Sequence, residues 1–97
     1  MKNYYFEEAK DSFEEQYNSY ALIDKSNDET ILLIEFFDNE NVWVVAFNDE
    51  NSLLLNIYKK YKFNNIKNDY VVFPTIKTAI SHIEQFINYY EQYLVFL

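Results

Sequence analysis

Cysteine, glycine and arginine are absent from this chain of 97 residues, and proline occurs once. Without cysteine the protein forms neither disulfides nor a cysteine-based zinc site. Without glycine it lacks the phosphate-binding loops of P-loop and dinucleotide-binding proteins. No apolar run approaches the roughly 20 residues that span a bilayer, and the N-terminal stretch lacks the apolar segment of a signal peptide. These absences predict a cytoplasmic protein without a membrane segment.

Apolar residues make up 49% of the chain and aromatic residues 21%. A chain of this length buries roughly 60–68% of its unfolded surface, enough for one core without cross-links. We therefore predict a single domain over residues 1–97. The net charge of −8 is unevenly spread, because residues 1–50 carry 13 acids and 3 lysines (−10) and residues 51–97 carry 3 acids and 5 lysines (+2). This asymmetry predicts one acidic side and one nearly neutral side.

Residues 3–18 have the periodicity of an amphipathic helix. At 100° per residue, Phe6, Phe13 and Tyr17 share one face, which would pack on the core. The opposite arc would carry a stripe of five carboxylates: Glu7, Glu8, Asp11, Glu14 and Glu15.

In the middle of the chain, apolar runs alternate with acidic turns. Residues 19–24, 30–37 and 42–47 are separated by about four residues rich in Asn, Asp and Glu, a pattern that predicts an antiparallel β-meander. In the absence of glycine, Asn and Asp are expected at positive-φ turn positions. The runs 30–37 and 42–47 are apolar on both faces, so each face needs a cover. Two helices would provide it, or helices on one face and a partner chain on the other.

Residues 52–61 fit a strand and a helix almost equally, and their alternation slightly favours the strand. Ser52 as an N-cap and the lysines at the end of the run suit a helix. Residues 70–73 predict a short strand, and residues 75–94 a helix with an apolar stripe. The predicted fold is α+β: an N-terminal helix, an antiparallel β-meander of three to five strands, and a long C-terminal helix packed on the sheet. The stripe of the last helix comprises Ile76, Ala79, Ile80, Ile83, Ile87, Tyr90 and Leu94.

The chain offers little catalytic chemistry. His82 is the single histidine, and the sequence identifies no nucleophile beside it, so a structural place at the edge of the core is favoured. The acidic turns lack the glycine and the spaced glutamate of a calcium-binding loop, which favours solvated turns over a metal site. We predict a protein that is not an enzyme and has no cofactor and no metal. A small enzyme that uses His82 is a third alternative.

Lysines and aromatic residues alternate over residues 59–63, as they do in proteins that bind single-stranded nucleic acid. In a chain of net charge −8 they make a poor site for a polyanion. Lysines that protect an edge strand are the simpler interpretation. We therefore predict no direct binding of nucleic acid.

The acidic residues are the most distinctive feature of the sequence. As a helix, residues 7–15 would display five carboxylates over about 12 Å, a density of the same order as the one charge per ~1.7 Å of duplex DNA. Acidic surfaces also keep aromatic-rich proteins soluble, and the sequence favours neither reading. The EEAKDSFEE segment and the DNEN and NDEN turns, in a short chain without cysteine, resemble small phage-encoded inhibitors of bacterial defence, such as anti-CRISPR proteins and anti-restriction DNA mimics. The resemblance implies binding to a defence nuclease and exclusion of its nucleic acid, without catalysis or a cofactor.

Our first hypothesis is an acidic inhibitor that blocks the basic nucleic-acid groove of a protein partner, such as a CRISPR or restriction nuclease component, in the cytoplasm of a host cell. The alternative is a structural or adaptor domain that homodimerises through an apolar sheet face, so the protein is a monomer or a homodimer. The predicted partner-binding residues are those of the helical stripe and the acidic turns: Glu7, Glu8, Asp11, Glu14, Glu15, Asp28, Glu29, Asp38, Glu40, Asp49 and Glu50.

Overall fold

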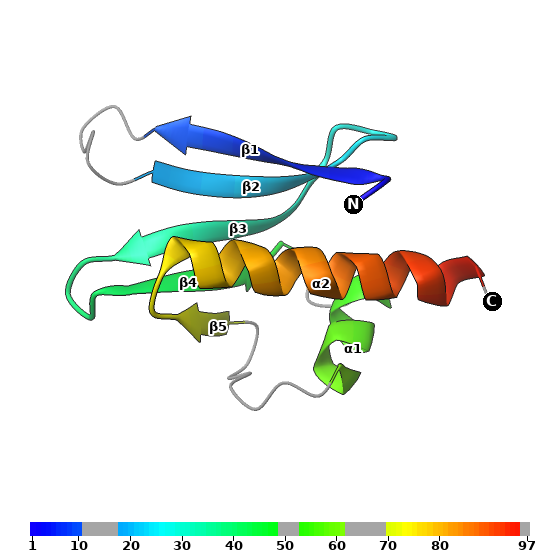
Figure 1. Cartoon of the computed structure of the whole chain (residues 1–97). Helices are drawn as coiled ribbons and strands as arrows, with labels where there is room; N and C mark the ends of the chain where they lie inside the picture. Colours follow the sequence, from blue (N-terminus) through cyan, green and yellow to red (C-terminus); the bar gives the residue numbers. More distant parts are fainter. Residues whose placement is uncertain (11–17, 49–52, 62–69, 96–97) are drawn as a thin grey trace.

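The computed structural model describes residues 1–10, 18–48, 53–61 and 70–95, which form an antiparallel sheet and two helices (Figure 1). Five strands lie in the sheet in the order in which they occur along the chain. The predicted α+β class and β-meander are confirmed. The elements are β1 (Tyr4–Lys10), β2 (Asn18–Asp24), β3 (Thr30–Phe37), β4 (Val42–Phe47), α1 (Leu53–Lys60), β5 (Tyr70–Phe73) and α2 (Ile76–Val95).

The predicted N-terminal helix is wrong for the part that the structure describes. Tyr4–Lys10 is the strand β1, and it pairs with β2 from Tyr4 opposite Asp24 to Lys10 opposite Asn18. An aromatic run favours a strand, and in this strand Phe6 packs against the core. The rest of the predicted helix, residues 11–17, lies outside the described residues.

The slight preference for a strand over residues 52–61 is also wrong, because Leu53–Lys60 is the helix α1. Leu53, which a strand would have buried beside Leu55, is 54% exposed. Lys59 and Lys60 therefore lie in the last helical turn and not on an edge strand. Cations in that turn interact favourably with the helix dipole. The buried positions have helical spacing: Leu54, Leu55, Ile57 and Tyr58.

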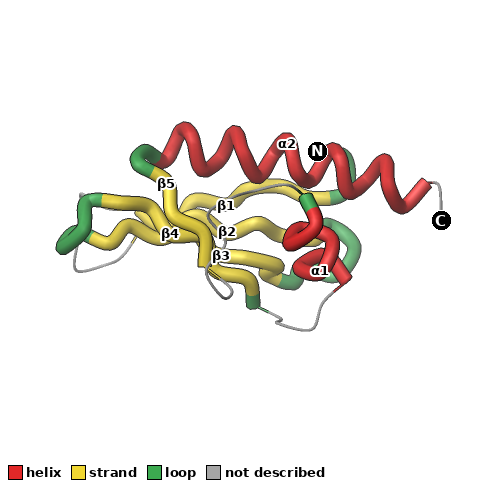
Figure 2. Tube along the Cα trace, turned by 90° about the horizontal axis from the view of Figure 1, so that it is seen from below, coloured by secondary structure: helices red, strands yellow, loops and turns green. Residues whose placement is uncertain are grey.

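The predicted strand at residues 70–73 and the C-terminal helix are confirmed. The Thr75 hydroxyl caps α2 by accepting a hydrogen bond of 3.1 Å from the backbone N–H of Thr78. The helix lies along one face of the sheet (Figure 2). It buries Ala79, Ile83, Ile87 and Tyr90 as predicted, and also Phe86, whereas Leu94 is exposed.

The expected turn chemistry of a glycine-free chain is confirmed. Within the described residues, Asp28 and Asn41 have positive φ angles of 59° and 54°. The β2–β3 turn is further held by Asp24, whose carboxylate accepts hydrogen bonds from the backbone N–H and the hydroxyl of Ser26 at 2.9 and 2.7 Å.

The hydrophobic core lies between the two helices and one face of the sheet. Tyr58 of α1 is fully buried there, with its ring centroid 5.0 Å from that of Phe47 and 4.6 Å from that of Phe86. The sheet contributes alternate residues of its strands, as side chains of period two require. These residues are Leu22, Leu32, Ile34, Val45, Phe47, Val71 and Phe73.

Candidate functional site

The face of the sheet opposite the core is also apolar, and we call it the open face. In the β3–β4 register, Leu33 lies opposite Ala46 and Phe37 opposite Val42. Because side chains alternate along a strand, these residues point away from the core, and none of them belongs to the core that includes α1 and α2. The described helices therefore pack on one face only. We define the open face by Glu7, Ala21, Leu33, Glu35, Phe37, Val42, Val44, Ala46 and Val72.

Large apolar side chains on the open face are accessible to solvent. Phe37 is 46% exposed and Val72 is 42% exposed. A pocket of about 210 Å³ on this face is lined by Glu35, Phe37, Val44 and Ala46. An exposed apolar patch of this kind is typical of an interaction site.

The predicted carboxylate stripe is not formed by the two of its members that the structure describes. Glu7 and Glu8 are neighbours in β1, where they are opposite Ala21 and Tyr20. Adjacent residues of a strand point to opposite faces, so Glu7 lies on the open face and Glu8 on the other. Both carboxylates are exposed. The remaining members of the predicted stripe, Asp11, Glu14 and Glu15, lie outside the described residues.

The acidic turns lie at the two ends of the sheet. Asp28 and Glu29 belong to the β2–β3 connection, whereas Asp38 and Glu40 belong to the β3–β4 connection at the opposite end of β3, and all four are exposed. The end of β4 lies beside the start of β3, because Asn48 donates a hydrogen bond of 2.8 Å from Nδ2 to the Thr30 carbonyl. Asp49 and Glu50, which follow, lie outside the described residues.

Glu35 is a site residue that the sequence analysis missed. It is the one acid in the apolar strand TILLIEFF, it is exposed, and it lies opposite Val44 on the open face. An isolated charge within a strand that is apolar on both faces was the available signal, because a charge marks the face that meets solvent. The open face thus carries carboxylates at Glu7 and Glu35 among apolar side chains.

His82 forms a polar pair with Tyr58 at the edge of the core. The Tyr58 hydroxyl lies 2.8 Å from Nε2 of the half-buried His82. The ring centroids of Phe73 and His82 are 5.2 Å apart. Burial raises the pKa of Tyr58 and lowers the pKa of His82. At neutral pH both groups are uncharged, so the hydroxyl can donate to an unprotonated Nε2.

In the described part of the chain, no three His, Asp or Glu side chains are grouped so that they could hold a metal ion. Of the two helices that it contains, neither is long and apolar enough to cross a membrane. Comparison with protein-family models, with curated proteins and with solved structures finds no significant match for the chain. The geometry and charge of the surface are therefore the basis for a functional proposal.

Proposed function

We propose that the protein is a non-enzymatic acidic inhibitor that docks on a basic surface of a nucleic-acid-handling protein and blocks its nucleic-acid groove. This is the role that the resemblance to phage-encoded inhibitors of CRISPR or restriction nucleases implies. The observation that carries the proposal is the open face, on which Phe37 and Val72 are exposed, Glu35 lies near Phe37, and Glu7 lies on the edge strand β1. Protein interfaces combine apolar contacts with polar groups, and this face offers both.

Charge defines the kind of partner that would fit. A net charge of −8 speeds association with a basic protein and repels nucleic acid itself. Charge raises the association rate more than the affinity, so the apolar side chains, Phe37 above all, would supply most of the binding energy. The matching surface carries apolar groups surrounded by lysines and arginines.

Homodimerisation through the open face is the second candidate function. It is favoured by the exposed area of Phe37 and Val72, which a second copy of the chain could cover. It is opposed by charge, because each copy brings a net charge of −8 and a carboxylate, Glu35, within the face itself. Charge repulsion between two copies therefore favours a different protein with a basic surface as the partner.

The decisive experiment is a competition assay, in which the protein displaces labelled nucleic acid from a purified CRISPR or restriction nuclease. Replacing both Phe37 and Val72 by Ser should weaken the competition by about tenfold or more, equivalent to about 1.4 kcal/mol. Leu94→Ser is the control, because the Leu94 side chain is exposed to a similar extent but lies on α2. Equal competition by all three proteins would remove the open face from the proposal.

Sedimentation velocity separates the two candidates. A monomer at 0.1 and 0.5 M salt, with competition that weakens as salt rises, is the outcome expected for the acidic inhibitor. A dimer that persists at both salt concentrations and dissociates in the Phe37→Ser, Val72→Ser double variant would instead support homodimerisation.

A further inference from the structure

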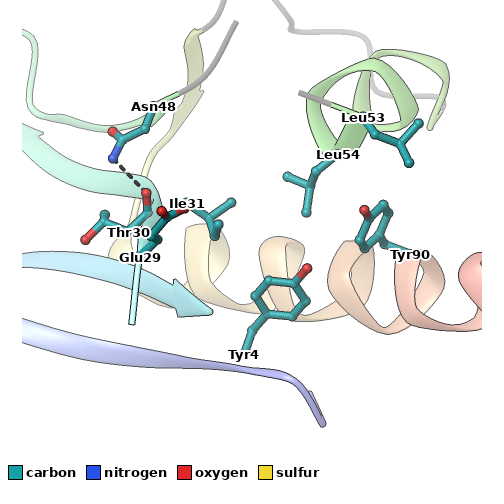
Figure 3. A pocket seen from close by; sticks show the side chains of 8 residues that line it. All are labelled: Tyr4, Glu29, Thr30, Ile31, Asn48, Leu53, Leu54 and Tyr90. Carbon is teal, nitrogen blue, oxygen red and sulfur yellow. Dashed lines mark hydrogen bonds between the residues drawn. The ribbon is translucent and has the colours of Figure 1, made fainter. Parts of the chain in front are cut away.

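A second pocket lies at the end of the sheet where the β2–β3 turn, the end of β4 and both helices meet (Figure 3). Its volume is about 310 Å³. Tyr4 of β1 and Tyr90 of α2 form part of its wall, together with Ile31 of β3 and Leu54 of α1. Glu29 also lines it, from the β2–β3 turn. Residues from both ends of the chain thus form one pocket, on the core side of the sheet and away from the open face.

Two tyrosine hydroxyls face this pocket (Figure 3). The Tyr90 side chain is only 7% exposed, and among the described residues neither its hydroxyl nor that of Tyr4 makes a hydrogen bond. Buried polar groups nearly always have a hydrogen-bond partner. The pocket therefore offers two polar atoms whose hydrogen bonds a ligand would complete.

Burial and neighbouring charges raise the pKa of both tyrosines. Burial, and after it the proximity of Tyr90, Asp24 and Glu91, raises the pKa of Tyr4 to about 12. Burial and Asp24 also raise the pKa of Tyr90. Both phenols are therefore neutral at pH 7, and their oxygens can accept hydrogen bonds from a donor. With Glu29 in the wall, the surroundings favour a positively charged donor.

Two charged side chains near this pocket already have hydrogen-bond partners. Lys25 donates a hydrogen bond of 3.2 Å from Nζ to the carbonyl of Lys2. The Glu91 carboxylate accepts hydrogen bonds from the backbone N–H groups of Lys2 and Asn3 at 2.9 and 3.2 Å. The Asp24 carboxylate accepts two hydrogen bonds from Ser26, so Glu29 is the carboxylate of this pocket that would pair with a cation from solvent.

We infer that this pocket binds a guanidinium or ammonium group carried on a short apolar stem, as in arginine and related amines. Glu29 pairs with the charge, and the hydroxyls of Tyr4 and Tyr90 accept its N–H groups. Ile31 and Leu54 contact the apolar stem.

Other ligand classes fit the pocket less well. An anion is repelled by Glu29 and by the neighbouring Asp24. A calcium ion needs six to eight oxygen ligands, and the described residues contain no group of three or more carboxylates or histidines. A purely apolar ligand would leave the Tyr90 hydroxyl buried without a partner. The inference does not depend on the proposed function, because the pocket and the open face lie on different sides of the sheet.

The test is a titration of the full chain followed by ¹H–¹⁵N NMR, with N-acetyl-arginine methylamide as the probe. Its matched control is N-acetyl-citrulline methylamide, which replaces the guanidinium by a neutral urea of nearly the same shape. The arginine compound should shift the amides of Ile31 and Leu54 in a saturable way, and the citrulline compound should bind about tenfold more weakly or less. Equal binding of both compounds, or no binding of either, would overturn the inference.

Variants locate the site. Tyr90→Phe keeps the ring and removes the hydroxyl, and Glu29→Gln keeps the shape and removes the charge; each should weaken the arginine probe by about three- to tenfold. Glu40→Gln is the matched control, because it is the same substitution in the acidic turn at the other end of the sheet. Equal weakening by Glu29→Gln and Glu40→Gln would show binding to the overall charge, and would overturn the site.

Two further probes identify the source of the ligand. Agmatine carries the guanidinium on a free small amine, whereas a five-residue peptide with arginine between glycines presents it as a side chain of a protein. Tighter binding of agmatine assigns the pocket to a small cation, and tighter binding of the peptide assigns it to an arginine of a protein partner. Both results support the site, and failure of both compounds to bind contradicts it.

Discussion

The two faces of the five-stranded sheet are built from the same strands, yet they have different surroundings. On the covered face, Ile34 and Val45 are opposite each other beneath the helices and are fully buried. On the open face, Phe37 and Val72 are exposed, although they are as apolar as the residues of the core. A sheet with one solvated face normally alternates apolar and polar residues. The open face therefore carries more apolar surface than the fold of the single chain requires, and this surplus favours a binding role.

The largest difference between the two faces is expected in stability. Phe86 is fully buried against the covered face and Phe37 is largely exposed on the open face, so the same substitution tests both. Phe86→Ala should lower the free energy of unfolding by about 3–5 kcal/mol, whereas Phe37→Ala should change it by less than about 1 kcal/mol. Urea denaturation of the two variants measures the difference. A similar loss in both would mean that the open face is covered in the native protein.

The next largest effect is expected in self-association. Glu35→Leu removes the charge from the centre of the open face and should favour pairing of two copies, with a dissociation constant lowered by about tenfold, or about 1.4 kcal/mol. Sedimentation velocity gives the dissociation constant. Glu84→Leu, an exposed acid on α2, is the control and should leave the protein unchanged. A wild-type chain that already dimerises as tightly as Glu35→Leu would contradict this expectation.

A smaller effect is expected from the polar pair on the covered side. Tyr58→Phe removes the hydroxyl that lies 2.8 Å from Nε2 of His82. The loss of one such hydrogen bond should lower the free energy of unfolding by about 1 kcal/mol. Tyr93→Phe is the matched control, because the Tyr93 side chain is exposed on α2. Equal denaturation midpoints for the two variants would show that the pair contributes nothing to the covered side.

The smallest effect is a pH dependence of stability that involves His82. Burial lowers the pKa of His82 below its unfolded value of 6.5, so between these two values the unfolded chain binds more protons than the folded one. The contribution of His82 to the free energy of unfolding is therefore constant above about pH 6.5 and falls as the pH decreases toward the pKa of the folded state. His82→Gln should reduce the loss between pH 7.5 and 5.5, measured by urea denaturation. If His82→Gln loses as much stability as the wild type, protonation of carboxylates and not of His82 causes the loss.

The sequence predicts those parts of the fold in which the spacing of apolar residues permits one interpretation. The meander over residues 19–47 and the helix after Pro74 were predicted because their runs are long and bounded by polar turns. The segment Leu53–Lys60 is too short for its period to decide between a strand and a helix. For Tyr4–Lys10, a helical wheel cannot show that β2 offers an adjacent edge, and pairing with that edge overrides the local pattern.

The candidate sites also differ in whether a local sequence pattern or only the folded protein reveals them. Apolarity on both sides of residues 31–47 predicted that each sheet face needs a cover, because that pattern is local, and it left open whether two helices or a partner chain would provide it. The pocket between Tyr4 and Tyr90 could not be predicted, since its walls come from opposite ends of the chain and meet only in the folded protein. The predicted carboxylate stripe depended on a helix, and for Glu7 and Glu8 the strand β1 separates the two side chains.

The order of the strands has a consequence for how the protein forms during synthesis. Each strand pairs with its neighbour in the chain, so the ladders that join β1, β2, β3 and β4 close over short connections at a low cost in loop entropy. All five strands and α1 leave the ribosome before α2, which spans Ile76–Val95. A sheet that assembles as it emerges therefore exposes its open face and, until α2 arrives, the part of the other face that α2 covers. During this interval the nascent chain exposes more apolar surface than the folded protein, and α2 covers part of it.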